Sequence, residues 1–422
     1  MTALFLATTI ALRGATLIDG TGAPAVPDAL LVIRDGRIVS AGPATPESLA
    51  AVPTGVSVRD VSRRWIVPGL IDAHVHADSE DDLKEMLRWG VTSVRLMAED
   101  TAAAQKLAER SRYPGARWPD VFPAAPIFTA KGGWWDEGEP PDRGLNRFPD
   151  TPAEARASVA AAKALGSAEI KLMLDDMAWC RAPRPTLPRM KAEVAKALVV
   201  EARRLGLRAT VHAPQVSDAR EAIADGATAL AHGVLDRLDP KTIAEMKRRP
   251  VFYIPTMDIF EFLADPRAFL DQVLADPAAL SIGREKAARY RSRAYADQYK
   301  ERYPNFENVR RHLPLLYENL RRLHEAGVPV ALGTDMWAFP GLGVSIELDL
   351  YVRAGFSPLE AIRAATQTAA RSLGVEKDRG TLEPGRKADF LLLEEDPLRD
   401  VKNVRRIVEV FKDGEPRQGA AR

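Results

Sequence analysis

The sequence predicts an α/β fold: a parallel (β/α)₈ TIM barrel with a small β-sandwich domain formed by both chain ends. Two observations support this fold class. Over residues 66–375, eight short apolar runs alternate with stretches of helical periodicity, which is the pattern of a barrel built from βα units. Over residues 1–65 and 376–422, short strand-like runs are separated by turn signals instead. We therefore expect the two chain ends to form the β-sandwich domain and residues 66–375 to form the barrel.

The two chain ends have a similar pattern, although they lie far apart in the sequence. Near the N-terminus, "LLVIRDGRIVSAG" places Asp35 and Gly36 between two alternating runs, which predicts a hairpin with a two-residue turn. Near the C-terminus, "KADFLLLEEDPL" and "VRRIVEVFKDGE" are strand-like runs of the same kind. Two distant strand-rich ends predict one small β-domain that both of them build.

The candidate barrel strands are apolar runs that lie between helical stretches such as 188–205. They are 66–75, 91–97, 121–129, 168–174, 207–213, 227–233, 251–257 and 328–335. The segment 258–316 is too long for a simple connection, so we expect a helical insert there. Tyr295, Tyr299 and Tyr303 follow one another at a spacing of four residues. This stripe should pack on the barrel or on another subunit.

The composition excludes several classes of protein. Lys and Arg number 59 and Asp and Glu 58, so no net charge favours nucleic acid or an anionic membrane as a partner. A single cysteine, Cys180, excludes an intramolecular disulfide and fits a reducing compartment. No apolar run approaches the roughly 20 residues that span a bilayer. We expect a cytoplasmic homo-oligomer with a small-molecule substrate, although the apolar start at residues 1–9 leaves a processed, secreted form open.

Histidines lie at the ends of several candidate strands. In "IVPGLIDAHVHADSE", His74 and His76 are two residues apart, so in a strand they point to the same face. His212, His232 and Asp335 also end candidate strands, and the carboxyl ends of barrel strands face the mouth where barrel active sites lie. Four imidazoles and a carboxylate around one opening suit a borderline metal, above all zinc. The alternative is that the histidines are ordinary core or surface residues.

Lys171 is unusual because it lies inside the apolar run "EIKLML". A charged ammonium would be expensive to bury there. A functional role in the barrel explains the position, and the alternative is a lysine that reaches solvent or forms an ion pair.

Five motifs together carry a resemblance to a known family. "PGLIDAHVH", "TVHA", "AHG", "GTD" and "GTLEPGRKADFLLLEEDPL" occur in this order over nearly the whole chain. The chain thereby resembles the amidohydrolase superfamily, nearest its imidazolonepropionase-like and prolidase-like members. The resemblance implies a metal-dependent hydrolase with two divalent ions, and zinc suits these ligands. The implied ligands are His74, His76 and Asp335 for the first ion, His212 and His232 for the second, and a carboxylated Lys171 as the bridge between them.

The resemblance also implies a catalytic role for Asp335. Beside a metal-activated water, Asp335 would accept a proton during attack and pass it to the leaving nitrogen. We expect a binuclear zinc hydrolase that cleaves an amide bond in a dipeptide or an N-acyl amino acid. A cyclic amide, a lactone or a carbamate is the alternative substrate, because this fold accepts many electrophiles. A non-catalytic scaffold on the same fold is a further alternative. The complete set of ligand positions disfavours it.

Four residues, Trp134, Arg181, Arg184 and Tyr253, are candidates for substrate contact, and Trp135 is considered together with Trp134. Relatives of this group often have "GGH" where "KGGWWDEG" places Trp134, so Trp134, with Trp135, forms either an apolar wall over the site or ordinary loop packing. Arg181 or Arg184 would pair with a substrate carboxylate, or else both are solvated loop charges. Tyr253 either contacts a substrate oxygen or belongs to the core.

Overall fold

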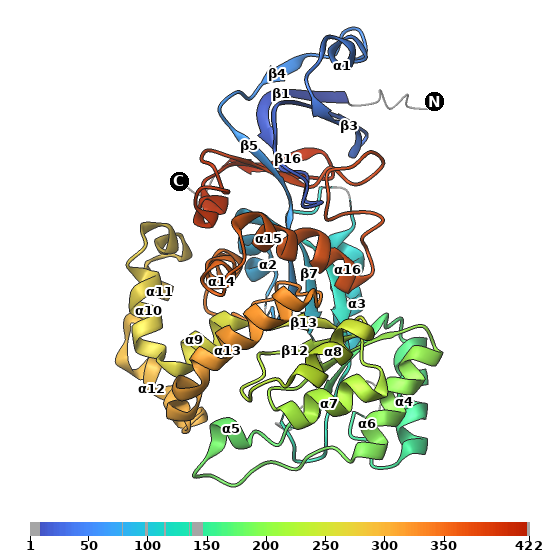
Figure 1. The fold of residues 1–422 in the computed structure, drawn as a ribbon, viewed down its shortest axis with the longest axis vertical. Helices are drawn as coiled ribbons and strands as arrows, with labels where there is room; N and C mark the ends of the chain where they lie inside the picture. The colour runs from blue at the N-terminus through green and yellow to red at the C-terminus, as the bar shows by residue number, and fades with distance from the viewer. Residues whose placement is uncertain are drawn as a thin grey trace.

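The computed structural model describes residues 9–77, 79–97, 100–113, 115–134, 136 and 147–419. Strands from both chain ends form one eight-stranded sheet, which lies at one end of the molecule (Figure 1). Its order is β16-β15-β14-β5-β1-β2-β3, with β4 beside β1. The strands are β1 (Thr9–Leu17), β2 (Val26–Arg34), β3 (Arg37–Pro43), β4 (Val58–Asp60), β5 (Trp65–Pro68), β14 (Phe390–Leu393), β15 (Ile407–Lys412) and β16 (Glu415–Gly419). The antiparallel pair β5–β14 joins the N-terminal strands to the C-terminal ones.

The turn between β2 and β3 is the predicted two-residue hairpin. Asp35 and Gly36 have φ angles of 50° and 75°, and a type I′ turn requires a positive φ at both central residues. A Cβ on Gly36 would also lie 2.7 Å from the carbonyl oxygen of Asp413. Glycine is therefore required here both by the backbone conformation and by the close approach of the β15–β16 turn.

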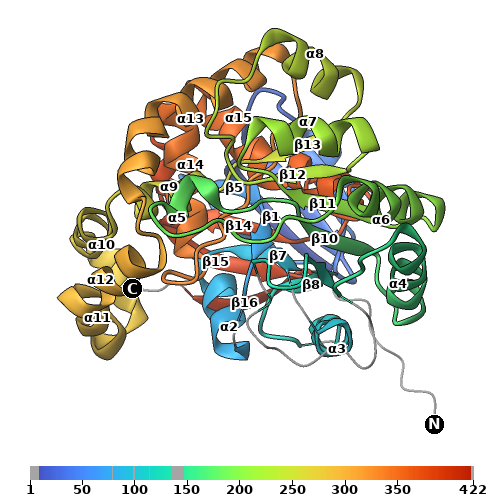
Figure 2. The same ribbon diagram turned by 90° about the horizontal axis from the view of Figure 1, so that it is seen from below.

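The central part of the chain forms parallel strands surrounded by helices (Figure 2). One ladder runs β6-β7-β8 and another runs β13-β12-β11-β10-β9. The strands are β6 (Leu70–Val75), β7 (Val91–Met97), β8 (Asp120–Ala124), β9 (Ile127–Phe128), β10 (Glu169–Met173), β11 (Arg208–His212), β12 (Ala229–Ala231) and β13 (Phe252–Ile254). Residues in β6, β7 and β10 are buried on both faces, as expected of parallel strands covered by helices.

Backbone hydrogen bonds link the two parallel ladders. Ala125 N donates to Glu169 O at 3.1 Å, next to β8 and β10. On the other side, the segment 329–335 lies between β13 and β6: Ala331 N donates to Tyr253 O, and Ala73 N donates to Leu332 O, both at 2.9 Å. This segment makes only an isolated bridge, between Tyr253 and Val330, in place of the regular strand predicted over 328–335. The arrangement is a TIM-barrel-like α/β fold.

The first predicted barrel strand, 66–75, proves to be two strands that belong to different sheets. β5 pairs with β1 and β14, whereas β6 pairs with β7. Gly69 separates them, and a Cβ at this position would lie 2.3 Å from the Thr92 hydroxyl oxygen. The apolar run is continuous because both strands are buried, so hydrophobicity alone could not reveal the boundary. The predicted strand 121–129 is likewise divided, into β8 and β9.

Helices cover the outside of the parallel strands (Figure 2). They include α2 (Glu80–Arg88), α3 (Thr101–Ser111), α4 (Pro152–Ala164), α6 (Ala192–Arg204), α7 (Val216–Asp225), α8 (Pro240–Arg248), α14 (Leu342–Arg353), α15 (Pro358–Arg363) and α16 (Ala369–Leu373). Several of these helices begin with a side-chain cap. At the start of α8, for example, Asp239 accepts hydrogen bonds from the backbone N–H groups of Lys241 and Thr242. The first N–H groups of a helix have no partner within the helix, and the cap provides one.

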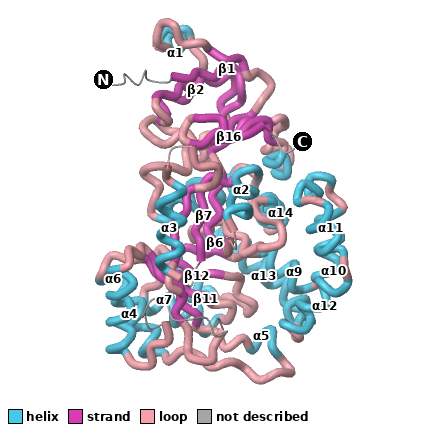
Figure 3. Tube along the Cα trace, turned by 180° about the vertical axis from the view of Figure 1, so that it is seen from behind, coloured by secondary structure: helices cyan, strands magenta, loops and turns pink. Residues whose placement is uncertain are grey.

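The long segment after β13 is helical, as the sequence predicts. It comprises α9 (Met257–Ala264), α10 (Pro266–Leu274), α11 (Arg284–Arg291), α12 (Arg293–Arg302) and α13 (Phe306–Ala326), and α10, α11 and α12 protrude on one side (Figures 1 and 3). The Tyr299 ring stacks on Trp337 at a centroid distance of 5.4 Å, and its hydroxyl oxygen accepts a 2.7 Å hydrogen bond from the indole N–H. The aromatic stripe therefore packs against the segment that follows Asp335.

Within the described part of the chain, we find no helix with both the length and the apolar character that a membrane crossing requires.

Candidate metal centre

His74 and His76 project from the carboxyl end of β6 toward a common point. His74 is 1% exposed, and the two ring centroids lie 5.7 Å apart. Their Nε2 atoms lie 3.7 Å and 3.4 Å from Oδ1 of Asp335. The strand period therefore places both imidazoles on one face, beside a carboxylate from the opposite end of the barrel sequence.

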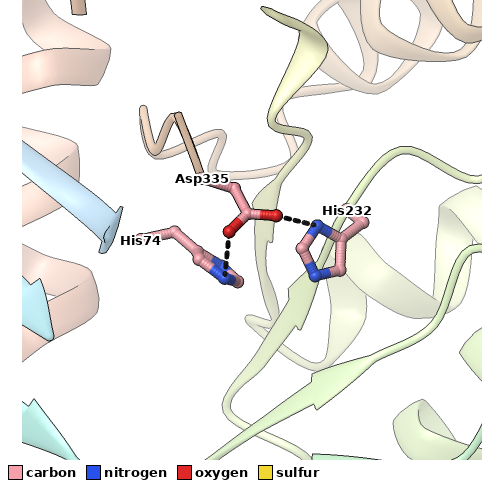
Figure 4. A group of neighbouring side chains, drawn as sticks. All are labelled: His74, His232 and Asp335. Atoms are coloured by element: carbon pink, nitrogen blue, oxygen red, sulfur yellow. Dashed lines mark ion pairs between the residues drawn. The ribbon is translucent and has the colours of Figure 1, made fainter. Parts of the chain in front are cut away.

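His232 and His212 complete the group from neighbouring strands. His232 directly follows β12, and its ring centroid lies 4.7 Å from that of His74 and 4.4 Å from that of His212, the last residue of β11. Its Nδ1 lies 3.9 Å from Oδ2 of Asp335 (Figure 4). One ligand atom from each of His74, His232 and Asp335 falls within 4.8 Å of the others, an arrangement that can hold a metal ion.

Two of these residues have unusual backbone conformations. His232 has φ 76° and Asp335 has φ 58°, a region that side-chain-bearing residues seldom occupy. Each such conformation costs on the order of 1 kcal/mol and persists where the surrounding structure enforces it, often at functional sites. Here it turns both side chains from the strand ends toward the shared centre.

The electrostatic environment keeps the imidazoles neutral. Burial lowers the pKa of His74 and His232 well below the ordinary value, and the neighbouring imidazoles and the ammonium of Lys171 act in the same direction. Burial and Lys171 lower the pKa of His76 to about 3. A neutral imidazole offers the lone pair that a metal requires, so these histidines are in the ligand form at neutral pH.

Lys171 lies in the middle of β10 and is 2% exposed. Its Nζ is buried and donates no hydrogen bond to any of the described residues. Burial, and secondarily the charge of Arg95, lower its pKa, although Asp335 opposes the shift. A buried amine without a partner is costly. Together with the neutral imidazoles and Asp335, it forms a donor set that fits divalent transition metals.

Asp72 is a buried residue of the candidate site that sequence reasoning missed. It is 2% exposed, and its Oδ1 accepts hydrogen bonds from the backbone N–H groups of His74 and Thr334, each at 3.0 Å. Its Oδ2 accepts a 2.7 Å bond from the Thr334 hydroxyl. Asp72 thus ties together the two segments that carry His74 and Asp335. Period-two alternation places it on the same strand face as His74, which is the signal that could have found it.

The predicted substrate contacts have different surroundings. Trp134 packs on the ring of Tyr303 at 5.8 Å, with the Arg302 guanidinium 4.9 Å from its ring centroid, so it joins the barrel loop to the insert. Trp135 lies outside the described residues, as do residues 1–8 of the N-terminal segment whose processing the sequence left open.

Arg181, Arg184 and Tyr253 do not converge on the histidines through any contact that the structure records. The Arg181 Nε donates a 2.9 Å hydrogen bond to Pro185 O within its own loop, and Arg184 is exposed. Tyr253 is fully buried, and its hydroxyl oxygen accepts a 3.0 Å hydrogen bond from Val234 N. The placement of Tyr253 favours the core alternative, because its hydroxyl already serves a backbone group.

The chain matches a family model and two relatives over most of its length. A model of the amidohydrolase family matches residues 65–417. An ochratoxinase from Aspergillus niger is 27% identical over 94% of this chain and 84% of its own length. An imidazolonepropionase from Deinococcus radiodurans is 26% identical over 89% of this chain and 88% of its own length.

Solved structures have the same fold. A Xaa-Pro dipeptidase with bound methionine in its active site matches with a TM-score of 0.77 and 20% identity. The match covers 98% of this chain and 100% of the dipeptidase chain. The structure of A. niger ochratoxinase matches with a TM-score of 0.74 and 23% identity, covering 98% of this chain and 96% of that one. The chain therefore belongs to the amidohydrolase family and is a hydrolase that acts on carbon–nitrogen bonds.

Proposed function

We propose that this protein hydrolyses the amide bond of a dipeptide or an N-acyl amino acid with the help of two divalent ions, Zn²⁺ being the ion that its ligands suit best. The observation that carries the proposal is the group of neutral, buried imidazoles around Asp335, next to a buried lysine amine that donates no hydrogen bond to the described residues. His74, His76 and Asp335 would hold one ion, and His212 and His232 the other.

A carboxylated Lys171 would complete both coordination spheres. Because burial lowers the pKa of Lys171, a larger share of the amine is uncharged at neutral pH, and only the uncharged amine can react with carbon dioxide. The nitrogen would add to carbon dioxide and release one proton to solvent, which would give a carbamate with a negative charge and two oxygens that suits a position beside two cations. The same step removes an unsatisfied buried amine from the barrel interior.

Asp335 is the proposed proton carrier. Bound divalent ions would supply a Lewis acid for the amide carbonyl and lower the pKa of a coordinated water. Burial raises the pKa of Asp335 in the metal-free protein, and bound cations would lower it again, so that the carboxylate would be in the ionised form that can accept a proton. It would take up a proton during attack on the carbonyl and deliver it to the leaving nitrogen.

The choice of substrate class draws on the relatives. Ochratoxinase and a Xaa-Pro dipeptidase are among the proteins that this chain resembles over more than nine tenths of its length. Trp134, against Tyr303 and Arg302, would provide an apolar wall for an acyl group or side chain. A cyclic amide is the second candidate, because imidazolonepropionase is also a relative over most of the chain; a lactone or a carbamate belongs with this alternative.

A panel of substrates with Zn²⁺-loaded protein tests this proposal. Free-acid dipeptides and N-acyl amino acids are compared with the same compounds amidated at the carboxylate, and with lactones and cyclic amides. If Arg181 or Arg184 pairs with the carboxylate, amidation should lower kcat/KM by about 10- to 100-fold, and the difference should shrink in the Arg→Met variant. Equal rates on the free and amidated forms would contradict the carboxylate contact and favour the cyclic-amide alternative.

We also propose that the parallel strands β6 to β13 and the segment 329–335 form one closed eight-stranded barrel, in which β8 and β9 are two parts of one barrel strand. Hydrogen bonds on both sides of the segment 329–335 support closure. We further propose that the chain divides into a small β-domain of residues 1–65 and 376–422 and a barrel of residues 66–375. The different pairing of β5 and β6 supports a boundary near Gly69.

A further inference from the structure

Asp175 is buried beside the predicted metal ligands but is not one of them. It follows β10, and it is 2% exposed. Its Oδ2 lies 3.1 Å from Nε2 of His212 and accepts a 2.6 Å hydrogen bond from the Trp179 indole N–H. Its Oδ1 accepts bonds from Met177 N and Gln215 Nε2, both at 2.8 Å. Each oxygen of this buried carboxylate therefore has two hydrogen-bonding partners.

The partners of Asp175 determine which nitrogen of His212 carries the proton. The indole N–H of Trp179 and the backbone N–H of Met177 can only donate, and they occupy different oxygens of Asp175. The carboxylate therefore acts as an acceptor on both oxygens. A neutral His212 that bonds to it must donate from Nε2, which leaves the lone pair of Nδ1 free.

We propose that Asp175 is a positioning residue that holds His212 in the Nε2–H tautomer, so that its Nδ1 can bind a divalent cation. The inference rests on the metal centre of the proposed function. Carboxylate partners of this kind fix the orientation of metal-binding histidines and raise their basicity.

The same carboxylate connects the metal ligand to the loop that carries Arg181. Trp179 belongs to the short helix α5 (Ala178–Arg181), and its carbonyl oxygen accepts bonds from the side-chain amides of Asn305 (3.2 Å) and Asn308 (3.0 Å) of the insert. Asp175 therefore joins His212, α5 and the insert in one chain of hydrogen bonds. A change at Asp175 should reach the metal ligand and the candidate substrate loop together.

An amide cannot replace this carboxylate. In Asp175→Asn, the side-chain NH₂ would face either the donors His212 and Trp179 or the donors Met177 and Gln215, and it can accept from none of them. The variant should lose the fixed tautomer of His212. Asp176→Asn is the matched control, because Asp176 lies in the same loop and bonds to Ala178 N and Gln215, but has no recorded contact with His212.

The experiment has two readouts, neither of which requires catalysis. The chain has six histidines, so ¹⁵N-histidine labelling of the metal-free protein gives a spectrum in which His212→Gln identifies one ring. Two-bond ¹⁵N–¹H correlations distinguish the Nε2–H from the Nδ1–H tautomer. Competition with a chelator then measures the affinity for Zn²⁺.

We expect an Nε2–H His212 in the wild type and in Asp176→Asn. In Asp175→Asn we expect loss of that signature and an affinity for Zn²⁺ that is about 10- to 100-fold weaker for one ion. Trp179→Phe, which keeps the carboxylate but removes one loop contact, should retain the tautomer. An Nδ1–H His212 in the wild type, or an Asp175→Asn protein with unchanged tautomer and affinity, would overturn the proposal. If the wild type binds no Zn²⁺, the proposed metal centre fails, while the tautomer still decides the role of Asp175.

Discussion

Burial in the barrel interior changes the chemistry of Lys171 and Asp335. In water, one would be a cation and the other an anion at neutral pH. Burial lowers the pKa of the lysine and raises that of the aspartate, so each moves toward its neutral form. The proposed metal centre would offset the cost of their burial, because a carbamate on Lys171 and the carboxylate of Asp335 would both bind cations.

Lys171→Ala should therefore lose bound metal and activity together. Alanine leaves the space that the carbamate would fill, so acetate or propionate should restore part of both by supplying a carboxylate there. Metal analysis and rates on the best substrate from the panel, with and without the acid, measure the effect. Lys163→Ala, at an exposed position of α4, is the matched control. A Lys171→Ala protein with full metal content and activity would contradict the bridging role.

Asp335→Asn tests the proton-transfer role. Asparagine keeps the size and one oxygen of the side chain but removes the basic site, so kcat should fall by about 10²- to 10⁴-fold. Because Asp335 is also a proposed ligand, kcat is measured at Zn²⁺ concentrations at which metal analysis shows wild-type content. A kcat close to that of the wild type under those conditions would mean that another base acts.

The sequence predicted that the candidate metal ligands lie close together, because strand periodicity and strand ends are local signals. His74 and His76 share a face through the period of two, and the carboxyl ends of parallel strands meet at one edge. The roles of Asp72 and Asp175 could not be read in the same way. Asp72 is bonded to Thr334 and Asp175 to His212, partners that only the folded chain brings together.

At the scale of elements, one glycine decides where the small sheet ends and the barrel begins. β5 and β6 are joined through Gly69, whose N–H donates a 2.8 Å hydrogen bond to Asp389 O. The sequence predicted a single strand over 66–75 because both parts are apolar. Most other predicted barrel strands were located correctly. The strand predicted over 91–97 matches β7 at both ends, whereas those over 168–174, 207–213, 227–233 and 251–257 extend beyond the ends of β10, β11, β12 and β13.

Gly69→Ala should destabilise the protein by about 1–3 kcal/mol, the usual effect of overpacking. The new Cβ would lie 2.3 Å from Oγ1 and 2.5 Å from Cγ2 of Thr92. Thr92→Ala removes both atoms, so the double variant should recover part of the loss in urea unfolding. Gly42→Ala is the control, because a Cβ at Gly42 would meet no atom within 4 Å and the φ of Gly42 is not positive. Equal effects of Gly69→Ala and Gly42→Ala would contradict the steric explanation.

At the scale of the whole molecule, a buried ion cluster joins the barrel to the small sheet. Asp120, the first residue of β8, is 1% exposed, and its oxygens lie 2.7 Å from Arg379 Nη1, 3.0 Å from Lys387 Nζ and 2.7 Å from Lys412 Nζ. Lys412 ends β15 and is also 1% exposed. No local sequence pattern indicated this cluster, because Asp120 and Lys387, for example, lie 267 residues apart in the chain.

The cytoplasmic location and the homo-oligomeric state stay predictions.

Asp120→Asn should lower the free energy of unfolding at neutral pH by about 3 kcal/mol, as expected when one partner of a buried ion pair is removed. This decrease in the free energy of unfolding should lie near the low end of the range for broken buried ion pairs. The reason is that Lys412 and Lys387 still pair with Asp413, at 3.1 Å and 2.6 Å. Asp81→Asn, which removes an exposed pair with Lys84, is the control and should cost less than about 1 kcal/mol. Urea unfolding measures both, and metal content should stay that of the wild type.

Acid pH provides a second test of the same cluster. Burial alone would raise the pKa of Asp120, but Arg379, Lys412 and Lys387 outweigh it and hold the pKa below the ordinary value. A carboxylate with a lowered pKa in the folded state stabilises the fold fully at pH values above its pKa in the unfolded chain, about 3.9. This contribution to stability is lost as the pH falls toward the folded-state pKa. The difference in stability between wild type and Asp120→Asn should therefore be constant from neutral pH to about pH 5 and shrink below about pH 4. A difference that grows on acidification would show that the cations around Asp120 do not stabilise its charge.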